Sequence, residues 1–170
     1  MIPAVGMAGL TDVSTAQILV GFGPTAHASL STALRSWLPR TVAHEVDHSV
    51  KTLGGPGVGA TLLDSLVSEG VASAFDTAAF PGRPHPWTDA ISPAQQCTMW
   101  KLAEPLLRSD GRYCQWMFGF AGVPHWTGFT LGNPIVRDDR FRHRHESWGP
   151  LTDASAATVL AGSHDDPCTR

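Results

Sequence analysis

Glutamate and lysine are scarce in this chain. Of its 170 residues, 15 are acidic but only 4 of these are Glu, and 12 are basic but only 2 of these are Lys. These two residue types ordinarily cover exposed helix faces, so their scarcity shows that the surface is not simply a set of charged helices. A residue type this rare is informative where it occurs, and the glutamates are Glu45, Glu69, Glu104 and Glu146.

Several classes of protein are disfavoured by what else the sequence lacks. No run of about 18 apolar residues occurs, so no membrane-spanning helix is expected. The formal net charge of −3 argues against a basic surface for nucleic acid. Residues 1–30 contain no Lys or Arg, so they lack the basic start of a signal peptide. We therefore expect a cytoplasmic protein, unless a signal lies upstream of this chain.

Cysteine is also rare. Cys97, Cys114 and Cys168 are an odd number and show no CxxC spacing. This pattern does not indicate a disulfide framework. It favours buried thiols in a reducing compartment.

The length and the pattern of apolar residues predict one α+β domain, mostly helical, over residues 1–163, with a disordered tail at 164–170. A small N-terminal sheet is expected from a buried strand at 16–22 and a short strand at 2–5. Helical spacing predicts further elements: a helix from Leu38 or Pro39 to residue 53, a helix at 62–75 capped by Thr61, a helix at 93–107, two short helices within 113–136, and a last helix at 152–160 capped by Thr152 or Asp153.

The motif that carries chemistry is His44-Glu45-Val46-Asp47-His48, an HExxH pattern on a predicted helix. Residues i and i+4 lie on one helix face, so the imidazoles of His44 and His48 can reach one zinc ion. Glu45, one step round the helix, can take a proton from the metal-activated water. Chance produces this pattern in about one in a hundred chains of this composition.

A catalytic zinc site ordinarily has a third protein ligand and leaves one position for water. Glu69 is the candidate, because it lies on the next predicted helix among apolar residues, where a carboxylate needs a partner. Gly70 and Ala72 would let the two ligand helices approach closely. A third histidine in the HExxHxxGxxH pattern is rejected, since Lys51 and Gly54 stand at its positions.

Two further roles, orienting a ligand imidazole and stabilising the oxyanion, each have more than one candidate residue. Either Asp64 or Ser65 is expected to orient a ligand imidazole, with a charge at the helix N-terminus as the alternative for Asp64. His125, in an apolar segment downstream, is the first candidate to stabilise the oxyanion, and Tyr113, the single tyrosine, is the second. His85 lies in a proline-rich loop and is expected to be solvated.

Four blocks of sequence resemble a bacterial domain family of predicted zinc-dependent proteases that carry HExxH and a downstream Glu ligand. The resemblance covers residues 6–163. It implies a zincin-like, specifically gluzincin-like, fold with His44, His48 and Glu69 as ligands of one catalytic zinc and Glu45 as base. The blocks are LP followed by TVAHEVDH, TLLDSLVSEGVASAF at 61–75, PHWTGFTLGNPIV at 124–136 and LTDASAATVL at 151–160.

The sequence departs from that family in three places. Phe129 stands where the family usually has Tyr, so a phenol that served as an oxyanion donor would be missing. Pro134 interrupts an expected helix and predicts a break there. Only about 25 residues precede the first helix, whereas a zincin normally has several strands there, one of which aligns an extended peptide.

We therefore expect a zinc metallopeptidase that hydrolyses peptide bonds in a peptide or protein substrate. Two alternatives stay open. In the first, the chain is a catalytically degenerate zinc-binding domain that acts as a protein-interaction module. In the second, it is a metal-free helical domain, in which His44, His48 and Glu69 would not converge.

Overall fold

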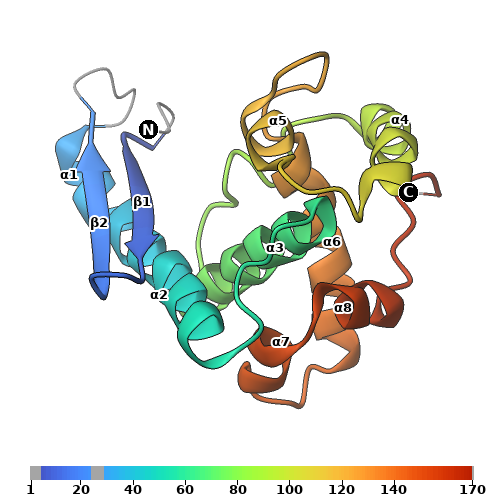
Figure 1. The fold of residues 1–170 in the computed structure, drawn as a ribbon. Helices are drawn as coiled ribbons and strands as arrows, with labels where there is room; N and C mark the ends of the chain where they lie inside the picture. Colours follow the sequence, from blue (N-terminus) through green and yellow to red (C-terminus); the bar gives the residue numbers. More distant parts are fainter. Residues whose placement is uncertain (1–4, 24–28, 170) are drawn as a thin grey trace.

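The expected α+β architecture, mostly helical with a small sheet, is confirmed (Figure 1). The computed structural model describes residues 5–23 and 29–169. The elements in chain order are β1 (Met7–Asp12), β2 (Gln17–Phe22), α1 (Leu30–Thr32), a π-helical turn η1 (Ala33–Trp37), α2 (Leu38–Gly54), α3 (Leu62–Ala79), α4 (Pro93–Ala103), a 3-10 turn η2 (Glu104–Leu106), α5 (Tyr113–Phe118), α6 (Thr127–Arg142), α7 (Gly149–Asp153) and α8 (Ala156–Gly162).

The sheet is a single antiparallel hairpin that lies along α2 (Figure 1). Met7 pairs with Phe22, and Asp12 pairs with Gln17. The strand expected at 16–22 is therefore present, but its predicted burial is wrong, because a two-stranded sheet has only one covered face and no residue of β2 is fully buried. The first strand begins at Met7; of the strand expected at 2–5, residues 2–4 lie outside the described residues.

Helices α2 and α3 both begin where the sequence predicts. Pro39 occupies the first turn of α2, where its missing N–H costs nothing. Thr61 caps α3: its hydroxyl accepts a hydrogen bond from the backbone N–H of Asp64, and the Asp64 carboxylate accepts one from the backbone N–H of Thr61. Pro39 and the Thr61 cap mark where the two helices that carry the candidate ligands start.

Helix α3 is the centre of the domain, with α2 on one side and α6 on another (Figure 1). Residues 65–73 are all buried. A methyl group on Gly70 would collide with the carbonyl of Gly132, and one on Gly132 would collide with the carbonyl of Leu66. The close approach that Gly70 permits is therefore with α6, and the expectation that it serves the contact with α2 is wrong.

Helix α6 continues through Pro134, so the break predicted there is wrong. Proline removes one backbone donor and crowds the preceding turn. The neighbouring residues Leu131, Ile135 and Val136 are fully buried against the core. Because that burial holds both halves of the helix on α3, it outweighs the missing hydrogen bond.

The C-terminal region differs from the expected single helix at 152–160. Two short helices, α7 and α8, are separated at Ala154, and the hydroxyl of Ser155 caps α8 by accepting from the backbone N–H of Thr158. Ser155, and not Thr152 or Asp153, is therefore the residue that caps the last helix. The boundary at residue 163 and the disordered tail stay predictions.

The expectation of three buried thiols is wrong. Cys97 on α4 and Cys168 form a disulfide across a separation of 71 residues, and Cys114 is an exposed free thiol. The odd count could not reveal the pair, because pairing depends on proximity in the fold. The expected cytoplasmic location thereby loses its support from reduced, buried cysteines. In the part of the chain that the structure describes, no helix is long and apolar enough to cross a bilayer.

Gly132→Ala is expected to lower the free energy of unfolding by about 2 kcal/mol, because a backbone carbonyl on α3 must move to admit the methyl group. Gly21→Ala is the control, since nothing lies within 4 Å of its added methyl group, and it should change stability by less than about 0.5 kcal/mol. Chemical denaturation measures both. Equal stability of the two variants would contradict the tight contact between α3 and α6.

Candidate metal centre

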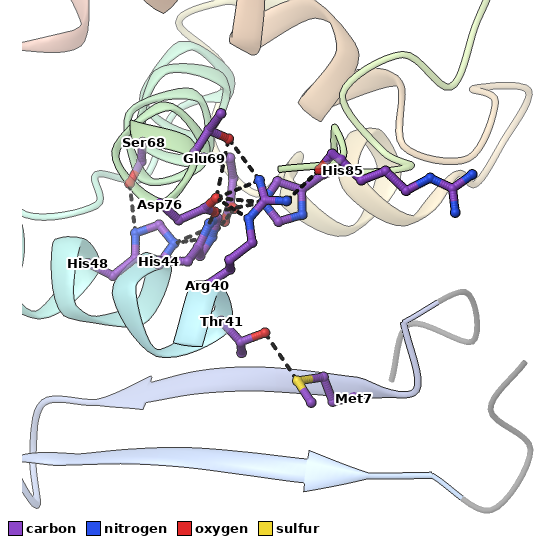
Figure 2. A network of polar contacts seen from close by, with 11 residues as sticks. Met7, Arg40, Thr41, His44, His48, Ser68, Glu69, Asp76 and His85 are labelled. Carbon is purple, nitrogen blue, oxygen red and sulfur yellow. Dashed lines mark hydrogen bonds and ion pairs between the residues drawn. The ribbon is translucent and has the colours of Figure 1, made fainter. Parts of the chain in front are cut away.

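His44 and His48 lie one turn apart on α2 and point in the same direction (Figure 2). Their ring centroids are 4.8 Å apart, and their Nε2 atoms are 3.2 Å apart. Both outer nitrogens, the Nδ1 atoms, face buried polar side chains of α3. The HExxH spacing thus produces the expected pair of imidazoles on one helix face.

Glu69 on α3 completes the group. Its Oε2 lies 3.1 Å from the Nε2 atom of His44, and its Oε1 lies 3.6 Å from the Nε2 atom of His48. The residue is only 6% exposed. These three residues converge as one potential metal-binding group, which contradicts the alternative of a metal-free domain in which they point apart.

The spacing of these atoms fits zinc. Ligands at 2.0–2.1 Å in a tetrahedron are about 3.3 Å from one another, close to the 3.1 Å between the Oε2 atom of Glu69 and the Nε2 atom of His44 and the 3.2 Å between the two Nε2 atoms. Two imidazoles and one carboxylate are also a donor set of catalytic zinc sites, which keep a fourth position for water. The residues therefore fit a single zinc ion.

The charges of these side chains depend on one another. Burial lowers the pKa of His44, but Asp76 and Glu69 outweigh it and raise that pKa to about 10. Burial raises the pKa of Glu69, but the neighbouring imidazoles of His48 and His44 hold it well below its usual value. Without metal, the centre thus pairs an imidazolium with a carboxylate, and a bound cation would take the place of the proton.

Asp76 is the residue that faces the outer side of His44 (Figure 2). It is fully buried, and its Oδ2 lies 3.5 Å from the Nδ1 atom of His44. Arg40 donates to Oδ1 at 3.0 Å from Nη2, and the Nε2 atom of His85 lies 2.7 Å from the same oxygen. Burial raises the pKa of Asp76, but the adjacent imidazoles of His44 and His85 outweigh it and lower that pKa to about 2.

His48 has a weaker partner on its outer side. The hydroxyl of Ser68 lies 3.3 Å from its Nδ1 atom. Partners of this kind determine which way a ligand imidazole faces and which nitrogen carries the proton. In this site both partners, Ser68 and Asp76, come from α3, the helix that also supplies Glu69.

Two expectations about these partners are wrong. Asp64 is held in the cap of α3 by Thr61, and Ser65 donates to the carbonyl of Thr61, so neither orients an imidazole. Asp76 was missed although it lies two turns beyond Glu69 on the same helix, a spacing that the sequence displays. His85 is buried, at 4% exposed, and not solvated, because its ring stacks on Trp87 and bonds Asp76.

Glu45 lies next to the ligands at the wall of a cavity of about 660 Å³. The hydroxyl of Thr11 on β1 lies 2.9 Å from its Oε2 and 2.8 Å from its backbone carbonyl. Gly9, on the same strand, leaves room for this side chain, since a methyl group there would overlap the carboxylate. The hairpin therefore holds Glu45 in place.

The candidates for the oxyanion role lie on the same cavity. Tyr113 donates a 2.8 Å hydrogen bond to the Oε1 atom of Glu69, and burial together with that carboxylate raises the pKa of its phenol far above its usual value. His125 is exposed and stacks on Trp126 with ring centroids 4.3 Å apart. Phe129 lines the cavity without a hydroxyl. The catalytic role of His125 stays a prediction.

Asp76→Asn is expected to weaken zinc binding by 10- to 100-fold, because the neutral amide no longer stabilises the correctly oriented His44. Competition with a chromogenic chelator measures the dissociation constant. Asp64→Asn is the matched control on the same helix and should leave zinc affinity unchanged. A similar loss in both variants would show that the contact between Asp76 and His44 is not responsible.

Zinc binding at pH 7 is expected to release close to one proton from His44. With a pKa of about 10 this imidazole is protonated at pH 7, and coordination requires its Nε2 to lose the proton. An ordinary imidazole would release only about a quarter of a proton. Calorimetry in two buffers of different ionisation enthalpy measures the number. The release from His44 should disappear as the pH rises through 10; a buffer-independent enthalpy at pH 7 would contradict this charge state.

Comparison with known proteins also points to zinc. A family described as "Predicted Zn-dependent protease (DUF2268)" matches residues 17–161, a span that contains all three candidate ligands and Glu45. A search of curated proteins and a search of solved structures each found no match. Because the family match covers most of the chain, the chain belongs to this family of predicted zinc-dependent proteases.

Proposed function

We propose that the chain is a zinc metallopeptidase of gluzincin type, with one zinc ion held by His44, His48 and Glu69. The observation that carries the proposal is the convergence of these three side chains at zinc-like spacing. It is supported by a cavity of about 660 Å³ along the same residues, which offers room for a peptide.

In this proposal, a bound zinc ion supplies Lewis acidity, which polarises the scissile carbonyl and lowers the pKa of water. Glu45 accepts one proton from the attacking water and passes it to the nitrogen of the leaving amine, so the carboxylate ends the cycle unchanged. Thr11 and Gly9 keep the Glu45 carboxylate against the cavity wall. Asp76 and Ser68 keep the two imidazoles aimed at the metal position.

Tyr113 and His125 have different parts in this scheme. The Tyr113 hydroxyl already donates to the Oε1 atom of Glu69 and leaves Oε2 facing His44, which favours coordination through one carboxylate oxygen. His125, exposed at the cavity wall, is then the available side chain to donate a hydrogen bond to the oxyanion.

The fold supports a zincin-like assignment through the placement of its elements. The HExxH helix α2 has the hairpin on one side and α3, with the third ligand, on another. The second candidate function, a zinc-binding interaction module without catalysis, is favoured by Phe129, which offers no oxyanion donor at its position on the cavity.

Glu45→Gln separates these two functions. The amide cannot accept the proton, so hydrolysis of unfolded casein should fall by 10²- to 10⁴-fold, while one zinc per chain remains by elemental analysis. Glu69→Gln should lose zinc and activity together. Glu104→Gln, at an exposed glutamate, is the control and should change neither. Zinc-loaded wild-type protein without any hydrolysis would overturn the peptidase proposal and favour the interaction module.

A further inference from the structure

The cavity beside the metal centre has one strongly apolar wall. Trp87, Phe118, Trp126 and Phe129, from three separate segments, form this wall, and Phe118 is the most exposed of them. The ring of Trp87 lies 6.2 Å from that of Trp126 and 6.1 Å from that of Phe129, both measured between centroids. We refer to these four residues as the aromatic wall.

The aromatic wall is connected to the candidate metal centre through intervening side chains. Trp87 stacks on His85 at 4.3 Å, and His85 bonds Asp76, the partner of His44. On another side, the ring of Phe118 lies 5.8 Å from that of Tyr113, whose hydroxyl bonds Glu69. The aromatic wall and the three candidate ligands line one cavity, so a peptide that spans this cavity would contact both.

No lysine or arginine is among the described residues that line this cavity. Arg40 lies close by, but it is buried, and its guanidinium is already bonded to Asp76, Thr77 and the carbonyl of Arg83. An enzyme that removes C-terminal residues needs a cation for the free carboxylate, and a bidentate arginine is the usual solution. This cavity does not supply one.

Each carboxylate that lines the cavity is already engaged. Glu69 faces His44 and bonds Tyr113, and Glu45 bonds Thr11. Asp76, the third, is held by Arg40 and His85. An enzyme that removes N-terminal residues needs an acidic partner for the free ammonium group of its substrate, because a buried charge without a partner is costly.

We propose that this chain cuts interior peptide bonds next to a large apolar side chain, which packs against the aromatic wall. The proposal rests on the peptidase function and adds its substrate class. Burying a Phe or Leu side chain contributes affinity through the area removed from water, whereas a charged side chain or chain terminus would lose water without finding a partner.

Binding of uncleaved peptides to zinc-loaded Glu45→Gln tests the preference apart from turnover. The probes are labelled eight-residue peptides, capped at both ends, that differ only in a central Phe, Asp or Lys, and fluorescence anisotropy measures their dissociation constants. We expect the Phe peptide to bind at least tenfold more tightly, and removal of either cap to tighten binding by less than twofold. Equal or tighter binding of the Asp or Lys peptide, or a tenfold gain on uncapping, would overturn the substrate class.

Phe118→Arg tests whether the aromatic wall contacts the substrate. Phe118 is 45% exposed, so arginine is accommodated without loss of the fold, and Phe141→Arg, at a 66% exposed Phe outside the cavity, is the matched control. In the Glu45→Gln background, Phe118→Arg should weaken binding of the Phe peptide and tighten binding of the Asp peptide. The ratio of their two dissociation constants should change by fivefold or more. The same ratio in both variants would overturn the contact.

Cleavage sites in a denatured protein digest separate failure of this inference from failure of the proposed function. Mass spectrometry of products from the wild-type protein should show interior cuts beside Phe, Leu or Met. Terminal trimming, or cuts beside charged residues, would overturn the substrate class while confirming a peptidase. The absence of any cut by zinc-loaded protein would overturn the peptidase function and, with it, this inference.

Discussion

The structure depends on one buried carboxylate. Glu69 lies in the middle of α3, on a stretch in which every residue from 65 to 73 is buried, and a lone charge there would be costly. The imidazoles of His44 and His48 offset that cost, and they reach it only if α2 packs directly on α3. The need of one buried carboxylate for a partner therefore favours the packing of α2 directly on α3.

The same helix carries the second layer of the site. Ser68, Glu69 and Asp76 all lie on α3, so three of the groups that make up the candidate metal centre belong to one helix. On its other side α3 packs on α6, where Gly70 and Gly132 permit the close approach. Packing far from the candidate site thus positions its residues, because a shift of α3 would displace Glu69 and both imidazole partners together.

The hairpin and the aromatic wall make this metal centre a candidate site for a peptide. Thr11 and Gly9 on β1 hold Glu45 toward the cavity, while Trp87 and Phe118 extend an apolar surface from the residues that contact the ligands. The carboxylates close to the candidate metal position each have a polar partner. The remaining free surface of the cavity is mainly apolar, and this distribution underlies the proposed preference for uncharged segments of a substrate.

The sequence by itself determined the local features: the HExxH spacing, the start of α2 at Leu38, the cap at Thr61 and a lone Glu among apolar residues, since each depends on neighbours within a few positions. Tertiary structure decided the partners of Asp76, His85 and Arg40, the pairing of Cys97 with Cys168, and the passage of α6 through Pro134. These features join segments distant in the chain or depend on burial, so local propensity cannot reveal them. Only packing energy, summed over the whole domain, selects them.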